Sequence, residues 1–286
     1  MSETVLEVSG VSRSYRSVRA ADDVSFTLGV GGSLGIVGES GSGKTTTARI
    51  VVGLERADAG EVLVRGLSRT VRARGRAARL ARARDVQMVF QDPFLSLDPR
   101  ITIDAALRET LRLHFPDGDH SRRLDELLDQ VGLGSRAAGA LPRQLSGGQR
   151  QRVAIARALA VEPAVLVLDE AVAALDVSVQ AQILNLLADI REQTGIAYLF
   201  ITHDLGVVRC VTDDVIVMRQ GRIVESGPTS QVLDGPQHPY TRLLLESIPR
   251  PGWNPQAIAL ARRALQPRGP RDHRPEIRTQ QIGDHR

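Results

Sequence analysis

Cysteine, lysine and aromatic residues are scarce in this chain of 286 residues. The single cysteine, Cys210, excludes an internal disulfide, a cysteine-based zinc site and an all-cysteine iron–sulfur cluster. Aromatic residues make up 3% of the chain, so the core must be built mainly from Val, Leu, Ile and Ala. No apolar run approaches the roughly 18 residues that cross a bilayer. The N-terminal sequence lacks the basic and apolar regions of a secretion signal, so we expect a cytosolic protein.

The charge balance is weakly basic, with 37 basic and 33 acidic residues and a net charge of +4. The length suits one large or two small domains. Positive charge is dense only between Arg65 and Arg84. We interpret that stretch as a solvent-exposed surface. The more specific alternative is a surface that faces anionic lipid headgroups. We expect no nucleic-acid partner.

Arginine supplies 36 of the 37 basic side chains, and the one lysine lies in the run Gly38-Glu39-Ser40-Gly41-Ser42-Gly43-Lys44-Thr45, followed by Thr46. This run fits the phosphate-binding loop pattern G-x-x-x-x-G-K-[ST]. Its glycines let backbone N–H groups converge on phosphate oxygens, and the following helix offers its positive end. An ammonium is a compact point charge, whereas a guanidinium is a wide fork that would not fit between the loop and the phosphates. We therefore expect a nucleotide hydrolase in which Lys44 holds phosphate and Thr45 supplies a hydroxyl to Mg²⁺.

The neighbouring residues predict the strand, loop and helix that such a loop needs. Ser33–Val37 reads as an apolar strand entering the loop, and Thr46–Leu54 as the helix leaving it, with Gly53 near its end. Further strands are predicted at Val5–Val8, Val24–Leu28, Gly60–Val64, Val86–Phe90, Ala164–Leu168, Tyr198–Thr202 and Val215–Met218. Helices are predicted at Gln151–Ala160, at Val179–Ile190 and, as an inserted subdomain, within Asp92–Leu145, where Gly132 follows an apolar stripe that includes Leu124 and Val131. Alternating strands and helices indicate an α/β fold.

Two acids, Asp169 and Glu170, follow the apolar run Ala164–Leu168. Such continuous runs are typical of central parallel strands covered on both faces. Carboxylates at the end of a buried strand lose part of their hydration, which costs free energy. We therefore expect these two to have a function that offsets the cost. We expect Asp169 to hold Mg²⁺ through water and Glu170 to act as general base on the attacking water. A solvated strand end would explain an acidic pair alone, but the phosphate-binding loop favours the catalytic interpretation.

A third motif, Leu145-Ser146-Gly147-Gly148-Gln149, precedes the predicted helix Gln151–Ala160. Serine followed by two glycines at a helix start makes an anion-binding N-terminus. An ordinary capped helix explains this stretch equally well when it is taken alone.

In this order and spacing the three motifs resemble the ATP-binding subunit of an ABC transporter, over about residues 4–248. The resemblance implies an ATPase domain of residues 1–248 with a RecA-like P-loop NTPase core, an antiparallel β subdomain and a helical subdomain at about 92–145. It also implies ATP and Mg²⁺ as ligands. Residues Ser146, Gly147, Gly148 and Gln149 would cover the γ-phosphate bound by a facing subunit, so that two ATP molecules lie between two ATPase domains.

The resemblance assigns four further positions. Gln91 matches a glutamine that reaches the metal and the attacking water, and His203 matches a histidine that contacts the γ-phosphate. Tyr15 matches the aromatic residue that stacks on adenine, and Asp176 matches an interface aspartate. Without the family, a structural histidine and a strand-edge tyrosine would be the better interpretations of His203 and Tyr15.

Three stretches are similar to the oligopeptide/dipeptide/nickel importer branch: Phe90–Arg100, Leu175–Gln182 and Gln237–Thr241, the last within a C-terminal segment of residues 228–248. Within that branch Ser96–Arg100 is more similar to the second (F-type) ATPase. The resemblance implies a second ATPase subunit, two transmembrane permease subunits and an extracytoplasmic solute-binding protein as partners, and a place on the cytoplasmic face of the membrane. An exporter ATPase and a soluble ABC protein acting on DNA or the ribosome are the alternatives.

Two features depart from the family pattern. Ala171-Val172-Ala173 stands where relatives have Pro, then Thr or Val, then Ser, which could detune hydrolysis without removing an essential group. The stretch 249–286 is rich in proline and arginine and reads as a flexible tail, with a possible short helix at Gln256–Leu265. It contains no cysteine, so we expect no iron–sulfur cluster, although some relatives carry one there.

Overall fold

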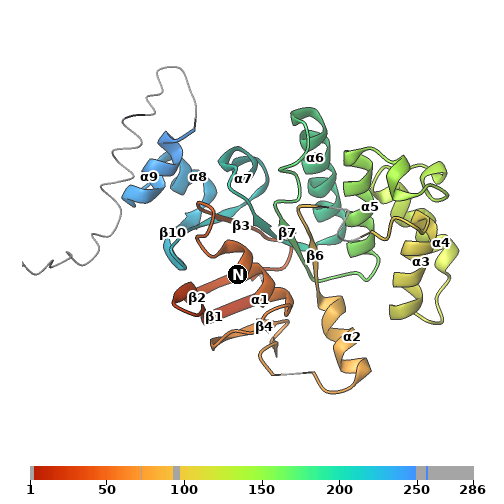
Figure 1. Ribbon diagram of the computed structural model, residues 1–286, viewed down its shortest axis with the longest axis horizontal. Coiled ribbons are helices and arrows are strands. Elements are labelled where there is room, and N and C mark those ends of the chain that lie inside the picture. Colours follow the sequence, from red (N-terminus) through yellow and green to blue (C-terminus); the bar gives the residue numbers. More distant parts are fainter. Residues whose placement is uncertain (1–2, 72, 93–96, 249–255, 257–286) are drawn as a thin grey trace, which may run out of the picture. The chain divides into compact units, whose positions relative to one another are not determined.

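The computed structural model describes residues 3–71, 73–92, 97–248 and 256 (Figure 1). The chain forms two compact units, Met1–Arg242 and Leu243–Arg286. The described part of the second unit is residues 243–248 and 256, and it includes the end of helix α9 (Pro239–Glu246). No helix of the described residues combines the length and apolar character needed to cross a membrane.

The strands of the first unit form two sheets within the described residues. The smaller sheet is antiparallel, in the order β2–β1–β4–β5, with β1 (Thr4–Tyr15), β2 (Val18–Gly29), β4 (Ala59–Val64) and β5 (Leu67–Ser68). The larger sheet has the order β10–β9–β3–β8–β7–β6, with β3 (Ser33–Val37), β6 (Val86–Val89), β7 (Val165–Asp169), β8 (Ala197–Ile201), β9 (Asp214–Arg219) and β10 (Arg222–Pro228). It is parallel except for the β9–β10 hairpin.

Helices surround the larger sheet. They are α1 (Lys44–Val52), α2 (Arg76–Asp85), α3 (Ile103–His114), α4 (His120–Gln130), α5 (Gly147–Leu159), α6 (Val177–Thr194), α7 (Leu205–Val211) and α8 (Thr229–Asp234), with 3-10 turns at Ser135–Ala137 and Pro142–Gln144. In Figure 1, α3 and α4 lie beside α5, away from the small sheet, and the three helices contact one another. This placement separates a helical part from the β-rich part.

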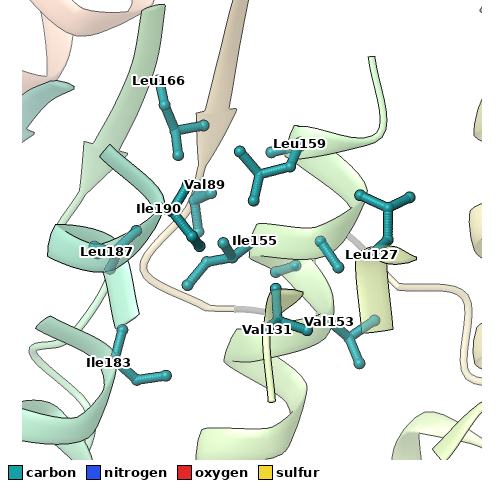
Figure 2. Packing of buried hydrophobic residues seen from close by; sticks show 14 of the residues in the cluster. Val89, Leu127, Val131, Val153, Ile155, Leu159, Leu166, Ile183, Leu187 and Ile190 are labelled. Carbon is teal, nitrogen blue, oxygen red and sulfur yellow. The ribbon is translucent and has the colours of Figure 1, made fainter. Parts of the chain in front are cut away.

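Strand β7 divides the core into two clusters because successive side chains of a strand point to opposite faces. Leu166 and Leu168 join a cluster with helices α3 to α6, whereas Val165 and Val167 join a second cluster with α1 and the small sheet. Figure 2 shows the first cluster, where Leu166 lies near Ile155 and Leu159 of α5 and residues of α6. All five β7 residues are buried, as its continuous apolar sequence predicts for a central parallel strand.

The predicted α/β class is confirmed, and each predicted strand overlaps an observed one. Helices α1, α3 and α5 begin at residues other than those predicted, and in each case the residue that caps the helix sets its first residue. Helix α1 begins at Lys44, two residues earlier than predicted, because Gly43 ends the loop with a φ of 104°. Helix α5 begins at Gly147 because Ser146 caps it. The helical pattern predicted from Asp92 onward produces its first described helix only at Ile103, whose N-cap is Thr102.

The arginine-rich stretch Arg65–Arg84 lies mostly in α2 and the turn before it. No residue of α2 is buried, which agrees with the interpretation as a solvent-exposed surface. The Arg82 guanidinium donates to the carbonyl of Ser68 (2.9 Å), and that of Arg69 donates to the carbonyl of Arg82 (2.6 Å). These arginines therefore fasten the turn to the helix.

Candidate functional site

The run Gly38–Thr45 connects the buried strand β3 to helix α1, as predicted. A Cβ atom on Gly43 would lie 2.0 Å from the carbonyl oxygen of Ala20 in β2, and one on Gly38 would lie 2.2 Å from that of Met218 in β9. Both glycines also have positive φ, 104° and 152°. The chain therefore needs glycine at these positions to turn tightly between two strands. Within the loop Ser42 is buried, Ser40 and Gly41 are exposed, and Glu39 and Thr46 are half-buried.

Lys44 is the first residue of α1 and is 6% exposed. Its ammonium donates to the carbonyl oxygens of Gly38 (2.7 Å) and Glu39 (2.9 Å) and so closes the loop on itself. Burial lowers the pKa of Lys44, and the carboxylates of Glu170, Asp169 and Glu39 oppose that shift. The side chain is thus a desolvated cation at the centre of the loop, where an anion would interact with it strongly.

The Thr45 hydroxyl and the Asp169 carboxylate lie together at the end of β7, with Oγ1 and Oδ1 3.5 Å apart. Burial and the neighbouring Glu170 raise the pKa of Asp169, against opposing effects of Arg49 and Lys44. A cation bound nearby would stabilise the negative charge of this carboxylate, which its surroundings otherwise disfavour. Hydroxyl and carboxylate oxygens are the kind of ligand that Mg²⁺ prefers, either directly or through its bound water. The two residues fit a Mg²⁺ site.

Glu170 follows Asp169 and has a φ of 48°, which is unusual for a residue with a side chain. Its backbone N–H donates to the carbonyl of Ile201 at the end of β8 (2.8 Å). Its carboxylate Oε1 lies 3.1 Å from Nδ1 of His203, two residues after that strand. The structure therefore brings these two predicted residues together, and a backbone conformation of this kind often occurs at functional sites.

Gln91 lies two residues beyond β6, at the same edge of the sheet as the acids, because Val89 pairs in parallel with Leu168. It is half-buried. In the stretch Phe90–Arg100 that suggested the importer branch, positions 93–96 lie outside the described residues.

The residues Ser146, Gly147, Gly148 and Gln149 form the start of α5. The Ser146 hydroxyl accepts from the Gln149 N–H (3.2 Å), and the Gln149 side chain accepts from the Ser146 N–H (2.9 Å), which is a capping box. A Cβ on Gly148 would lie 2.4 Å from Cγ1 of Val179 in α6. The capped-helix interpretation is therefore correct locally, and it leaves the predicted phosphate contact with a facing subunit untested.

Asp176 is the N-cap of α6, where its carboxylate accepts from the N–H of Val179 (2.9 Å) and the hydroxyl of Ser178 (3.0 Å). These hydrogen bonds lower the pKa of Asp176, with that from Val179 contributing most. The residue therefore has a structural role within its own chain, in addition to the interface role that the sequence predicts. Val177 beside it is 83% exposed.

Tyr15 ends strand β1, is 39% exposed and lies under the guanidinium of Arg13, 4.9 Å from the ring centre. It pairs with Val18 at the tip of the β1–β2 hairpin. That hairpin reaches the phosphate-binding loop two residues later, at Ala20, which contacts Gly43. The exposed ring is therefore on the strand pair that borders the loop.

Two residues near the site were not predicted from the sequence. Arg49 is one turn of α1 beyond Thr45 and lowers the pKa of Asp169. Tyr240 accepts a hydrogen bond through its hydroxyl from the N–H of Glu39 (3.1 Å), although 201 positions separate them. The position of Arg49 one helical turn after Thr45 could have indicated that it lies near Asp169. No local sequence pattern indicates the hydrogen bond between Tyr240 and Glu39.

Comparison with known proteins gives two family matches: residues 21–173 match the family described as ABC transporter, and residues 224–277 match the oligopeptide/dipeptide transporter, C-terminal region. The glutathione import ATP-binding protein GsiA of Escherichia coli (strain K12) is 48% identical over 241 residues, which are 84% of this chain and 38% of GsiA. The chain thus spans less than half the length of that relative.

Two further comparisons cover most of both chains. An ATP-binding protein of Brucella abortus (strain 2308), named for peptide import, is 49% identical over 235 residues, or 82% of this chain and 70% of the relative. The dimeric post-hydrolysis structure of the ATP-binding cassette MJ0796, bound to ADP and Pi, matches with a TM-score of 0.70 at 29% identity over 78% of this chain and 98% of that one.

Proposed function

The chain belongs to the ABC transporter family, and we propose that it is the ATP-binding and hydrolysing subunit of an importer for peptides or a related small solute. One observation carries the proposal. The structure brings Lys44, Thr45, Asp169, Glu170 and His203 to the carboxyl edge of the parallel sheet. Thr45 contacts Asp169, Glu170 contacts His203, and both acids act electrostatically on Lys44. Two findings support the solute class. Residues 224–277 match the C-terminal region of oligopeptide/dipeptide transporters, and the similar proteins are named for peptide import and glutathione import.

Each side chain has a distinct role in the proposed hydrolysis. Lys44 and the loop N–H groups bind the β- and γ-phosphates, and Thr45, Asp169 and Gln91 hold Mg²⁺, which neutralises charge on the phosphates when bound. Glu170 accepts a proton from water as the water oxygen bonds to the γ-phosphorus and the bond to the β-phosphate oxygen breaks, giving ADP and phosphate. The contact with His203 orients the Glu170 carboxylate.

The site requires a second ATPase domain in this proposal. The start of α5 presents Ser146, Gly147, Gly148 and Gln149 as a capped helix end that suits an anion, and none of them hydrogen-bonds to the loop Gly38–Thr45 in the described residues. A facing subunit would receive them over its own phosphates, with Asp176 at the interface and Tyr15 against the adenine. The dimeric form of the matching cassette MJ0796 supports this pairing. A different ATPase as partner fits the resemblance to the importer branch.

A groove beside Gln91 suits the permease subunits. It has a volume of about 390 Å³ and lies between the end of β6, helix α3 and helix α5. Its lining combines apolar residues, such as Phe90 and Leu113, with Glu109 and Thr110. A short amphipathic helix of a permease would meet apolar and polar partners there. This docking would place the chain on the cytoplasmic face of the membrane, with a solute-binding protein on the other side of the assembly.

The expected flexible tail and the expected absence of an iron–sulfur cluster concern residues 249–286, which, apart from Gln256, lie outside the described residues. Both stay predictions. Analysis of iron and sulfide in anaerobically purified protein tests the second.

The test of the proposed function is the variant Glu170→Gln in the complete assembly, with the partner's site silenced. We expect ATP binding to persist, turnover to stop and the closed dimer to accumulate, because the amide cannot take the proton from water. The control is Glu162→Gln, since Glu162 also has a positive φ, 55°, but pairs with Arg123 (3.6 Å) away from the site. Normal turnover in the Glu170→Gln assembly would refute the assignment. Co-purification with two permeases and a binding protein separates an importer from an exporter or a non-transport protein.

A further inference from the structure

The peptide group between Gly38 and Glu39 is held at both ends by side chains. Its carbonyl oxygen accepts from the Lys44 ammonium (2.7 Å), and its N–H donates to the hydroxyl oxygen of Tyr240 (3.1 Å). The two partners lie on opposite sides of one planar group. A rotation of that plane would break both hydrogen bonds together.

The backbone at this point does not fix the plane by itself. Gly38 has a φ of 152°, in a region that only glycine adopts readily, and glycine permits many alternatives. Hydrogen bonds must therefore select the observed orientation. Lys44 supplies the first, and Tyr240 supplies the second from a distant part of the sequence.

Tyr240 is itself held rigidly. Its side chain is 2% exposed, and the guanidinium of Arg219 lies 4.9 Å from the ring centre. Arg219 ends strand β9, two residues after Val217, which pairs with the last residue of β3. The ring thus packs against a side chain of β9, the neighbour of strand β3 that leads into the phosphate-binding loop.

The turn before Tyr240 is equally well defined. The Glu225 carboxylate in β10 accepts from the backbone N–H groups of Gln237 (2.7 Å) and His238 (3.1 Å). Nδ1 of His238 accepts from the N–H of Tyr240 (3.1 Å), and the Arg242 guanidinium donates to the carbonyl of Pro236 (2.9 Å). These bonds fix the segment Gln237–Tyr240 and therefore fix where the Tyr240 hydroxyl points.

We propose that Tyr240 is a positioning residue for ATP binding: its hydroxyl sets the Gly38–Glu39 peptide, which in turn sets the ammonium of Lys44. The inference rests on the proposed function, in which Lys44 binds the phosphates. It gives the segment that resembles peptide importers a role in the nucleotide site of its own subunit. The Glu39 N–H, bonded to Tyr240, supports the loop and leaves phosphate binding to the later N–H groups.

The decisive variant is Tyr240→Phe, which keeps the ring and removes the hydroxyl. Tyr198→Phe is a matched control, because Tyr198 is 1% exposed and its hydroxyl donates to the carbonyl of Leu187 (2.9 Å), within the core cluster of helices α3 to α6. Each variant removes a tyrosine hydroxyl that donates or accepts a hydrogen bond, partly buried at Tyr240 and buried at Tyr198. Urea unfolding measures the general loss of stability in both.

Two readouts separate positioning from packing. In the nucleotide-free protein, amide hydrogen exchange over residues 38–45 should be faster in Tyr240→Phe and unchanged in Tyr198→Phe. The affinity for Mg-ATP should fall roughly fivefold in Tyr240→Phe, about the effect of one hydrogen bond, and KM should rise more than kcat falls. Tyr198→Phe should lower the unfolding midpoint and leave the affinity unchanged.

Equal exchange and equal ATP affinity in wild type and Tyr240→Phe would overturn the inference, as would parallel losses of affinity in both variants. Glu225→Gln, which loosens the turn without touching the ring, is a second variant with the same expected direction if Tyr240→Phe fails to fold. Failure of the wild-type chain to bind ATP would refute the proposed function instead, and the exchange measurement would still test the contact of Tyr240 with the loop.

Discussion

Replacing Gly43 with alanine tests whether the phosphate-binding loop is defined by its contact with β2. The new Cβ would lie 2.0 Å from the Ala20 carbonyl oxygen, which is backbone and cannot move aside as a flexible side chain could. A side chain at a φ of 104° also strains the backbone. Strain of this kind costs about 1–3 kcal/mol. Forcing an extra group into a packed site costs about 1–3 kcal/mol more.

The matched control is Gly53→Ala at the other end of α1. Gly53 has a φ of 81°, and a Cβ there would meet no atom within 4 Å. This variant therefore carries the backbone strain without the collision. The difference between the two variants isolates the contact with Ala20, and we expect it to be about 1–3 kcal/mol of unfolding free energy.

Urea unfolding followed by circular dichroism, without nucleotide, measures both free energies, provided that the urea dependence is the same in all variants. Titration with Mg-ATP then asks whether the loop still binds. We expect Gly43→Ala to lose affinity and Gly53→Ala to keep it. Equal destabilisation by the two variants would show that the collision is relieved and that β2 does not define the loop.

Three further predictions concern the same site. Lys44→Arg should weaken ATP binding roughly 10-fold or more, because a wider group must fit a buried position; unchanged affinity in a titration would contradict this steric argument. Gly148→Ala should destabilise the chain by about 1–3 kcal/mol, with recovery on adding Val179→Ala, whereas Gly147→Ala, where a Cβ would be 3.6 Å from its nearest neighbour, should be tolerated. Asp169→Asn should raise the unfolding temperature of the nucleotide-free protein at neutral pH. The raised pKa means that the folded state disfavours the charged form, so the native stability falls as pH rises through the pKa of Asp169. The advantage of the variant should therefore shrink as pH is lowered, and an advantage independent of pH would refute this cause.

The sequence predicts features that depend on neighbouring residues in the chain. The apolar run before Asp169 identifies the central strand, because a strand covered on both faces has no polar alternation. The loop around Lys44 follows from glycine spacing between a strand and a helix. Val5–Val8 was predicted as a strand, but β1 extends to Tyr15, since its register shifts against β2 interrupt the alternation that a sequence pattern detects.

Features that depend on distant contacts could not be predicted. A side chain at residue 43 would clash with a backbone carbonyl oxygen in β2. Every residue has a backbone carbonyl, so no residue type in the sequence marks this contact. The hydrogen bond from Glu39 to Tyr240 spans 201 positions and needs the whole sheet to be assembled. Glu170 has a φ of 48° and bonds to Ile201 of the neighbouring strand, and no pattern in the sequence around it predicts either feature.

The contact of Gly148 with Val179 has a mechanical consequence. A Cβ on Gly148 would lie 2.4 Å from Cγ1 of Val179, so the starts of α5 and α6 are closely packed and a shift of one would displace the other. The start of α6 is joined to Glu170 by a short run with two tight turns, from Ala173 to Glu170 and from Leu175 to Val172. If the start of α5 covers a facing subunit's phosphates and Glu170 is the general base, as proposed above, this packing would couple the two events. Movement of α5 on nucleotide binding would shift α6 and, through the two turns, Glu170 of the same subunit.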